Sequence, residues 1–418
     1  MNRIVNPTSV EPSAPPNAAA GMTSLAALSS RPGLSTSTRL SLRVVKFAKQ
    51  AGIVLAALAL VAWLALSVRA GLARNGIGFD MGFLRQAANF DISEGYIVTW
   101  KGIRSFTAAD TNAEALLAGF YNTIKTAAVS IVLATVLGLL VGMARISHNW
   151  LVRQLSFGFV ELARNTPMLI QLVFWYFAVV LQMPALTDAS RWFGGILFSK
   201  QGLYVPAVAL AEHASNGALW SLFAGTAFAL AAFAARKVQR MGHLFLALSA
   251  AALVAAIALG FPLTVATPHV DGFLVDGGVA ASPEFAALFL GLSVYTAAFI
   301  AEIVRGAILA LPKGQWEAAA ALGLSRRYAF RDVVIPQVFR VVLPAFGNQY
   351  ISLAKTTSLG IAIGFSDLFN VYGTVANTSG RNLEGVIVVM LAYLVLSWTI
   401  SFVVNFVNRR LLLAGASR

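Results

Sequence analysis

Long runs of apolar residues alternate with short polar or basic connections from residue 51 onward. A helix needs about 20 predominantly apolar residues to cross a bilayer. Eight runs meet or approach that length: Ala51–Val68, Leu117–Met143, Phe157–Leu181, Gly217–Ala235, Leu244–Thr264, Phe285–Ile300, Val341–Ile363 and Gly385–Asn408. The pattern therefore predicts an all-α polytopic membrane protein with about eight transmembrane helices.

Composition agrees with that pattern and excludes several kinds of chemistry. Of the 418 residues, 58% are hydrophobic and 11% are charged, whereas soluble domains carry about 25% charged residues. The sequence contains no cysteine, which excludes disulfides, cysteine-ligated zinc and thiol catalysis. The formal net charge of +14 is interpreted as membrane topology and not as nucleic-acid binding, because the basic residues cluster between the apolar runs.

The basic connections predict an orientation in the membrane. Lys and Arg concentrate on the cytoplasmic side of spanning helices, and four basic residues precede the first run, so the N-terminus is placed inside. Alternation then places both termini in the cytoplasm. The connections predicted to lie inside are 148–153, 236–243, 305–340 and the pair Arg409-Arg410, whereas 264–284, with two Asp and no Lys or Arg, lies outside.

One cytoplasmic connection, residues 301–340, is too long and too charged for a simple turn. It contains Glu317-Ala-Ala-Ala-Ala-Leu-Gly323, then nine residues, then Val333-Val-Ile-Pro336. Pro312 and Gly314 interrupt the preceding helix, and the Ala-rich stretch Gln315–Leu322 favours a new one. Glycine is suited to the left-handed turn that ends a helix. The spacing predicts a short helix, a turn at Gly323 and a second helix.

This segment resembles the E-A-A-x3-G signature of bacterial ABC importer permeases, and from Ala301 to Ser325 it is similar to their polar amino acid branch. In that family the element docks in a groove of the ATPase subunit and transmits the power stroke. An Ala-rich amphipathic helix at the membrane interface is the alternative interpretation. The resemblance implies a coupling role for Glu317, Ala318, Ala319, Gly323 and Pro336.

Two further blocks resemble the same branch. Glu161-Leu-Ala-Arg-Asn-Thr-Pro-Met-Leu-Ile-Gln171 has Asn165 where the family has Gly, and the second block runs from Asn348 to Leu359. Together the blocks cover residues 119–408. The enlargement beyond a five-span core resembles permeases of broad-specificity L-amino-acid importers. The implied organisation is a disordered arm (1–40), an extra first helix and periplasmic loop (41–116), a transport domain (117–410) with an inserted hairpin (217–264), and a cytoplasmic tail (411–418).

Polar residues inside apolar runs are candidates for the substrate path, because ionisable groups in a span are costly and default to functional roles. Lys355 and its neighbouring hydroxyls could hold an amino acid carboxylate; an ion pair or a Lys snorkelling to the outer interface is the alternative. Pro167 predicts either a kink in its helix or a position that lines the substrate path. The candidates are Asn165, Thr166, Gln171, Asn348, Lys355, Thr356, Thr357 and Ser358.

Four further residues carry structural expectations. Glu302 and Arg305 lie three residues apart on one helix face, which favours a local salt bridge that seats the loop. Gly138 and Gly142 predict close helix packing. Lys125 is expected at the outer lipid interface.

No phosphate-binding G-x-x-x-x-G-K-[ST] motif occurs, so ATP and Mg are expected in a partner and the chain itself is not an enzyme. The resemblance implies two ATP-binding-cassette ATPase subunits, a second permease subunit, a periplasmic amino-acid-binding protein, and a location in the bacterial inner membrane. Membrane lipid is expected as a further partner, and nucleic acid is not. No cofactor, catalytic residue or metal site is expected in this chain. The alternatives are an ion-gradient-driven secondary transporter and an intramembrane enzyme.

Overall fold

The computed structural model describes residues 36–74, 78–99, 102–189, 191–192, 194–211, 215–234, 239–272 and 274–416. The chain forms two compact units, Met1–Phe79 and Asp80–Arg418. Most of the arm predicted to be disordered lies outside the described residues.

In the first unit the structure describes one long helix, α2 (Thr36–Arg74). Its apolar part, Ala48–Gly71, is long enough to cross a membrane. The helix begins inside the stretch 1–40 that was predicted to be disordered. The residues from Leu40 to Lys49 include Leu, Arg, Lys and Ala, which are strong helix formers, so the helix extends beyond the apolar run.

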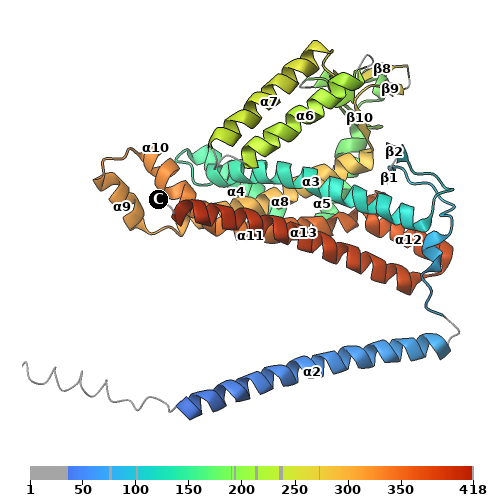
Figure 1. The fold of residues 1–418 in the computed structure, drawn as a ribbon, viewed down its shortest axis with the longest axis horizontal. Coiled ribbons are helices and arrows are strands. Elements are labelled where there is room, and N and C mark those ends of the chain that lie inside the picture. Colours follow the sequence, from blue (N-terminus) through green and yellow to red (C-terminus); the bar gives the residue numbers. More distant parts are fainter. Residues whose placement is uncertain are drawn as a thin grey trace, which may run out of the picture. The chain divides into compact units, whose positions relative to one another are not determined.

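Two helices, α3 (Asn112–Ala144) and α8 (Pro283–Leu309), make the most extensive helix contact of the second unit (Figure 1). Small residues occur at every fourth position of α3 along this contact. A Cβ atom on Gly138 would lie 2.5 Å from Cγ2 of Ile300, and one on Gly142 would lie 2.9 Å from the carbonyl oxygen of Ala301. The predicted close packing is therefore confirmed, and it depends on the absence of side chains there.

The apolar run Phe157–Leu181 is not one continuous helix, and the kink predicted at Pro167 is confirmed. The chain instead forms α4 (Trp150–Asn165) and α5 (Met168–Phe174), which continues through the π-turn η2 (Trp175–Val179) and the 3-10 turn η3 (Val180–Gln182). The two parts are bent by 107°. Thr166, with φ −96° and ψ 127°, is extended because the ring of Pro167 disfavours a helical residue before it.

The C-terminal part begins with α11 (Ile335–Thr356), which packs on α8 and α13. The 3-10 turn η6 (Thr357–Ile363) follows, and Gly364 then turns the chain with a φ of +80°. A bend of 54° leads into α12 (Leu368–Ser379), which packs on α3. The last helix is α13 (Asn382–Ala416).

Residues 310–334, here called the helical loop, connect α8 to α11. They form α9 (Lys313–Ala321), the short α10 (Arg326–Tyr328) and the π-turn η5 (Ala329–Val334). In Figure 1 the loop lies at one end of the helical body, beside the C-terminal end of α13. The predicted helix, turn and helix are confirmed, although α9 begins at Lys313, directly after Pro312, and not at Gln315.

The second unit also contains short strands that hydropathy did not predict. Segment 80–111 holds η1 (Gly82–Arg85) and a hairpin of β1 (Tyr96–Thr99) and β2 (Gly102–Ser105). Between η3 and α8 lie the 3-10 turn η4 (Leu186–Asp188), β3 (Arg191–Trp192), β4 (Ile196–Ser199), β5 (Gly202–Val205), β6 (Ala207–Leu210), α6 (Asn216–Ala234), α7 (Gln239–Ala258), β7 (Leu263–Ala266), β8 (His269–Asp271), β9 (Leu274–Asp276) and β10 (Val279–Ala281).

These strands join at the base of the α6–α7 hairpin in antiparallel sheets, with strand order β10-β5-β4-β3 in the largest and separate pairs β6-β7 and β8-β9. The predicted helix Leu244–Thr264 is therefore wrong at its end: α7 stops at Ala258, and Gly260, with a φ of +83°, turns the chain toward β7. Of the tip predicted at 236–243, residues 236–238 lie outside the described residues, and residues 239–243 begin α7. Within the described residues α6 and α7 pack on each other.

The described residues contain five helices that are long and apolar enough to cross a membrane, or up to seven if each bent pair counts as one span. The apolar part of α6, Asn216–Ala232, is shorter than these. The prediction of a mostly helical polytopic membrane protein is confirmed, and the count of eight spans stays a prediction.

Candidate functional site

The first candidate feature is the helical loop, whose turn is built by Gly323. This residue has a φ of +74°, its N–H donates to the carbonyl of Ala320 at 2.9 Å, and the N–H of Leu324 donates to Ala319 at 3.1 Å. These two bonds form a Schellman motif, which needs a residue that tolerates the left-handed conformation. The predicted helix end at Gly323 is confirmed in its geometry.

Contacts across the turn hold the helical loop in one shape. The rings of Trp316 and Phe330 stack with centroids 6.4 Å apart, and Nε2 of Gln337 donates to Oε1 of Gln315 at 3.0 Å. Ala319 is buried, whereas Glu317 and Ala318 are exposed. Glu317, the first residue of the E-A-A motif, therefore lies on the surface of the loop, whereas Ala319 packs inward.

Pro336 lies in the first turn of α11, directly after the π-turn η5. A cavity of about 640 Å³ separates the helical loop from the C-terminal end of α3. Its lining residues include Ile146, His148, Ile308, Trp316, Glu317 and Arg326.

A charge cluster lies where α8 approaches the helical loop. Nη2 of Arg305 is 2.5 Å from Oε1 of Glu302, so the predicted local salt bridge is confirmed. Glu302 also pairs with Arg145 at the end of α3, a partner that spacing along one helix could not reveal. The guanidinium of Arg145 lies 5.2 Å from the centroid of the Phe157 ring on α4. The cluster therefore joins α3, α4 and α8.

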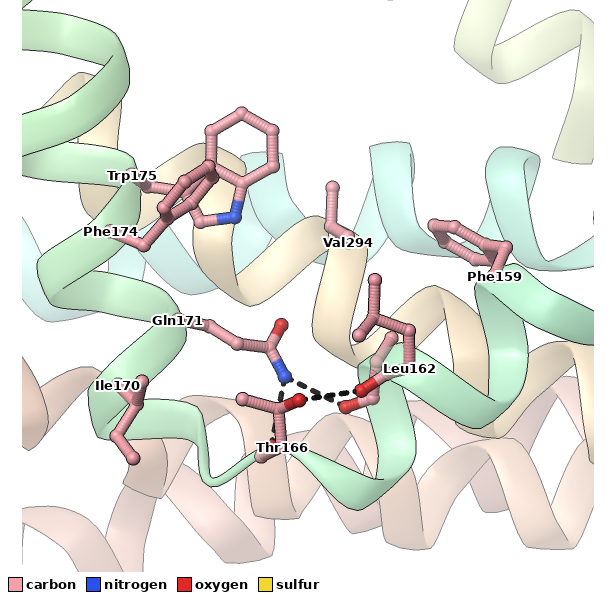
Figure 2. A pocket seen from close by; sticks show the side chains of 9 residues that line it. Phe159, Leu162, Thr166, Ile170, Gln171, Phe174, Trp175 and Val294 are labelled. Carbon is pink, nitrogen blue, oxygen red and sulfur yellow. Dashed lines mark hydrogen bonds between the residues drawn. The ribbon is translucent and has the colours of Figure 1, made fainter.

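The second candidate feature is a pocket of about 440 Å³ at the bend between α4 and α5. Figure 2 shows the Gln171 side chain reaching back across the bend, with apolar and aromatic side chains on the other walls. Nε2 of Gln171 donates to the carbonyls of Ala163 at 2.7 Å and Thr166 at 2.9 Å. Its amide nitrogen thus satisfies carbonyls at the end of α4.

The neighbouring polar side chains also stabilise the bend. The hydroxyl of Thr166 donates to the carbonyl of Leu162 at 2.8 Å, and Nδ2 of Asn165 donates to Oε2 of Glu161 at 2.9 Å. The predicted candidates Asn165, Thr166 and Gln171 are therefore brought together, but their donors are used within α4 and α5. In Figure 2 the amide oxygen of Gln171 points away from the carbonyls that its nitrogen contacts.

The third candidate feature is a row of polar residues along α11. The residues Arg340, Asn348, Ser352 and Lys355 are all exposed, at spacings of three, four or eight that keep them on one helix face. Within the described residues, none of their side chains makes a hydrogen bond or ion pair. We call these four residues the polar row.

Sequence reasoning had named Asn348 and Lys355 but had missed Arg340 and Ser352. The signal that could have found them is a four-residue spacing in a segment that is otherwise mostly apolar. Arg340, Asn348 and Ser352 follow this spacing, and Pro344 occupies the position between the first two.

The hydroxyls next to Lys355 have a different role. Thr356 donates to the carbonyl of Ser352 at 2.8 Å, Thr357 to Ala354 at 3.0 Å, and Ser358 to Lys355 at 2.9 Å. These bonds satisfy carbonyls at the C-terminal end of α11. Of the four adjacent candidates, Lys355 alone keeps a polar side-chain group without a partner among the described residues.

A groove of about 470 Å³ lies beside Lys355, between η6, α12 and α13. The helix α5 packs against η6, so the bend pocket and this groove lie on connected elements. The groove is lined by Lys355, Ser358, Phe369, Val386, Val389, Met390, Tyr393 and Leu394.

Known proteins resemble this chain over most of its length. Residues 134–412 match the family described as "Binding-protein-dependent transport system inner membrane component". The putative amino-acid ABC transporter permease protein YhdX of Escherichia coli (strain K12) is 36% identical over 371 residues, which cover 86% of this chain and 92% of that protein. The general L-amino acid transport system permease protein AapQ of Rhizobium johnstonii is 38% identical over 366 residues, with coverages of 84% and 88%.

A third relative, the glutamate/glutamine/aspartate/asparagine transport system permease protein BztB of Rhodobacter capsulatus, is 31% identical over 393 residues, covering 84% of this chain and 90% of that protein. The family match includes the bend, the helical loop and the polar row, whereas α2 and segment 80–111 lie before it.

Proposed function

Because the chain belongs to the binding-protein-dependent transport system inner membrane components, we propose that it is the permease subunit of an ATP-driven importer of amino acids. Relatives that match nearly their whole length carry amino acid transport in their names. The cargo is therefore an L-amino acid or a group of L-amino acids.

The observation that carries this proposal is the polar row of α11. Exposed polar and cationic side chains are costly against lipid, and in spanning segments they face a water-filled cavity or another protein. The row extends along α11 from Arg340 near the helical loop to Lys355 near η6. A face of this kind, formed by one subunit of a pair, supplies one wall of a translocation path.

The helical loop is the element that receives mechanical work. Its exposed Glu317 and Ala318 form the surface offered to an ATPase, while Ala319, Gly323 and Pro336 give that surface its shape. The hydrogen bond from Nε2 of Gln337 to Oε1 of Gln315 links the loop to the start of α11. Movement of the loop would therefore reach the polar row through α11 itself.

The working assembly contains two ATPase subunits that bind ATP and Mg, a second permease subunit, identical or related, and a periplasmic amino-acid-binding protein. The chain lies in the bacterial inner membrane with both termini in the cytoplasm. Residues 117–410 form the transport domain, and the α6–α7 hairpin is an insertion in it. Asn348 and Lys355 line the path, whereas Asn165, Thr166, Gln171, Thr356, Thr357 and Ser358 shape it.

The experiment reconstitutes the chain in proteoliposomes with its ATPase and binding protein, and records ATP hydrolysis and the uptake of labelled L-amino acids. We expect uptake only with ATP and both partners. The double substitution Glu317→Lys and Gly323→Asp should abolish uptake and co-purification with the ATPase. Asp276→Lys, a charge reversal at an exposed residue of β9, is the control and should leave both unchanged.

Uptake driven by an ion gradient without the ATPase would favour a secondary transporter. Wild-type behaviour of the double variant would remove the coupling role from the helical loop.

A further inference from the structure

We propose that Lys355 binds the carboxylate of the transported amino acid, and that the groove beside it receives an uncharged side chain. This inference rests on the proposed function and adds to it the part of the cargo that the permease recognises. The groove lies where α11 meets η6, at the end of the polar row remote from the helical loop.

The ammonium of Lys355 is available for an anion. In the part of the chain that the structure describes, it makes no ion pair or hydrogen bond. Two other basic residues of the helical body, by contrast, are paired: Nζ of Lys125 is 2.5 Å from Oε2 of Glu94, and Arg145 pairs with Glu302. A cation without a partner on a spanning helix is costly, and an anionic ligand would compensate that cost.

The groove has the size and lining of a small-molecule site. Its volume of about 470 Å³ falls within the range of roughly 300–1,000 Å³ for such sites. Apart from Lys355 and Ser358, the walls are aliphatic or aromatic. The hydroxyl of Tyr393 is directed to buried Asp367, with Oη 3.3 Å from Oδ2, so this residue contributes mainly its ring to the groove.

Charge complementarity selects which end of an amino acid lies at Lys355. No acidic residue lines the groove, and the charged members of the polar row, Arg340 and Lys355, are both positive. The site therefore attracts a carboxylate and repels an ammonium. Because the remaining walls offer no second charge, an uncharged side chain such as that of leucine fits them better than a charged one.

The test uses the complex of permease and ATPase in nanodiscs of zwitterionic lipid, without the binding protein. Equilibrium binding of each labelled L-amino acid that the intact system imports is measured for wild type, Lys355→Met and Lys355→Arg. Lys200→Met, an exposed lysine in the turn between β4 and β5, is the matched control. Co-purification of the ATPase confirms that each variant is folded.

We expect Lys355→Met to weaken binding by about tenfold or more, the loss typical of a charge-assisted hydrogen bond. Lys355→Arg should retain most of the affinity, and Lys200→Met all of it. For leucine as ligand, 4-methylpentanoate should compete, whereas leucinamide, which lacks the carboxylate, should not.

Three results would overturn the proposal: wild-type affinity in Lys355→Met, equal competition by leucinamide, or no binding of any imported amino acid by the wild-type complex. Loss of wild-type binding in nanodiscs that contain phosphatidylglycerol would instead assign the groove to an anionic lipid headgroup. Failure of the intact system to import amino acids would reject the proposed function itself, and is measured separately.

Discussion

Lys125 of α3 and Glu94 of segment 80–111 form an ion pair in which Nζ lies 2.5 Å from Oε2. The other carboxylate oxygen of Glu94 accepts the N–H of Ser282, the residue that caps α8. The amide of Asn122 donates to the carbonyls of Glu94 and of Ser366, the residue before the α12 cap. Glu94 and Asn122 thus join the first half of α3 to the start of α8 and to the corner before α12.

Replacing Glu94 by Gln should destabilise the permease, because it leaves the ammonium of Lys125, whose side chain is 23% exposed, without its counter-charge. We expect a loss of about 2 kcal/mol, or roughly a 5 °C lower melting temperature of the purified complex. The double variant Glu94→Gln with Lys125→Met should recover part of this loss, because the unpaired charge is gone. An unchanged melting curve for Glu94→Gln would contradict the role of the pair.

Gly138→Val should separate α3 from α8. The new Cβ would approach Cγ2 of Ile300 to 2.5 Å and the carbonyl oxygen of Ala297 to 3.0 Å, so the helices must move apart. Overpacking of this kind costs about 1–3 kcal/mol or more, and the amount of folded protein recovered from the membrane should fall severalfold. The control is Gly158→Val on α4, where a Cβ meets nothing within 4 Å; equal recovery of the two variants would refute the prediction.

Gln171→Leu should loosen the bend between α4 and α5. The substitution keeps a similar volume but removes the donor that satisfies the carbonyls of Ala163 and Thr166, at a cost of about 1–3 kcal/mol. We expect faster hydrogen exchange in residues 162–172 and slower amino acid uptake. Gln171→Glu, which also lacks the donor, should behave alike, and protection equal to wild type in either variant would show that the bend does not need this bond.

Glu302→Gln should reduce transport per ATP hydrolysed. The neutral amide weakens the pair with Arg145, which holds the C-terminal end of α8 to the end of α3, and the pair with Arg305 within α8. If that link carries movement from the helical loop, the ratio of amino acid uptake to ATP hydrolysis should fall severalfold while the ATPase stays bound. Parallel loss of both activities would indicate a purely structural role. Exchanging the charges, with Glu302→Arg and Arg145→Glu, tests whether the pair itself matters.

Acidification should release the β1–β2 hairpin from the turn before α3. Arg104 contacts Asp110 with Nη2 and Oδ1 2.5 Å apart, and this guanidinium lowers the pKa of the Asp110 carboxyl from 3.8 to about 2. A depressed folded-state pKa contributes stability above the unfolded value, near pH 4, and loses it as the pH falls toward 2. Hydrogen exchange in residues 102–111 should accelerate over that window in wild type, and Asp110→Asn should remove this dependence.

The sequence by itself determined the class of the protein, the approximate places of most helices and the local shape of the helical loop. These features depend on local information: the length of an apolar run, the position of a basic flank, or the order of residues around Gly323. A glycine in the left-handed conformation and an Ala-rich helix before it are properties of neighbours in the chain. The local geometry of the helical loop was predictable for that reason.

Tertiary structure decided which polar residues remain available for cargo. Gln171 and Thr357 were candidates beside Lys355 in the sequence, yet each donates to a backbone carbonyl at a helix end. Pro167 indicated a kink, but hydropathy could not show how large the bend is, because a broken span and a straight one have the same apolar length. The partners of Lys125 and Arg145 come from segments 31 and 157 residues away. Such pairs form only when helix packing brings distant segments together, and no periodicity along the chain encodes them.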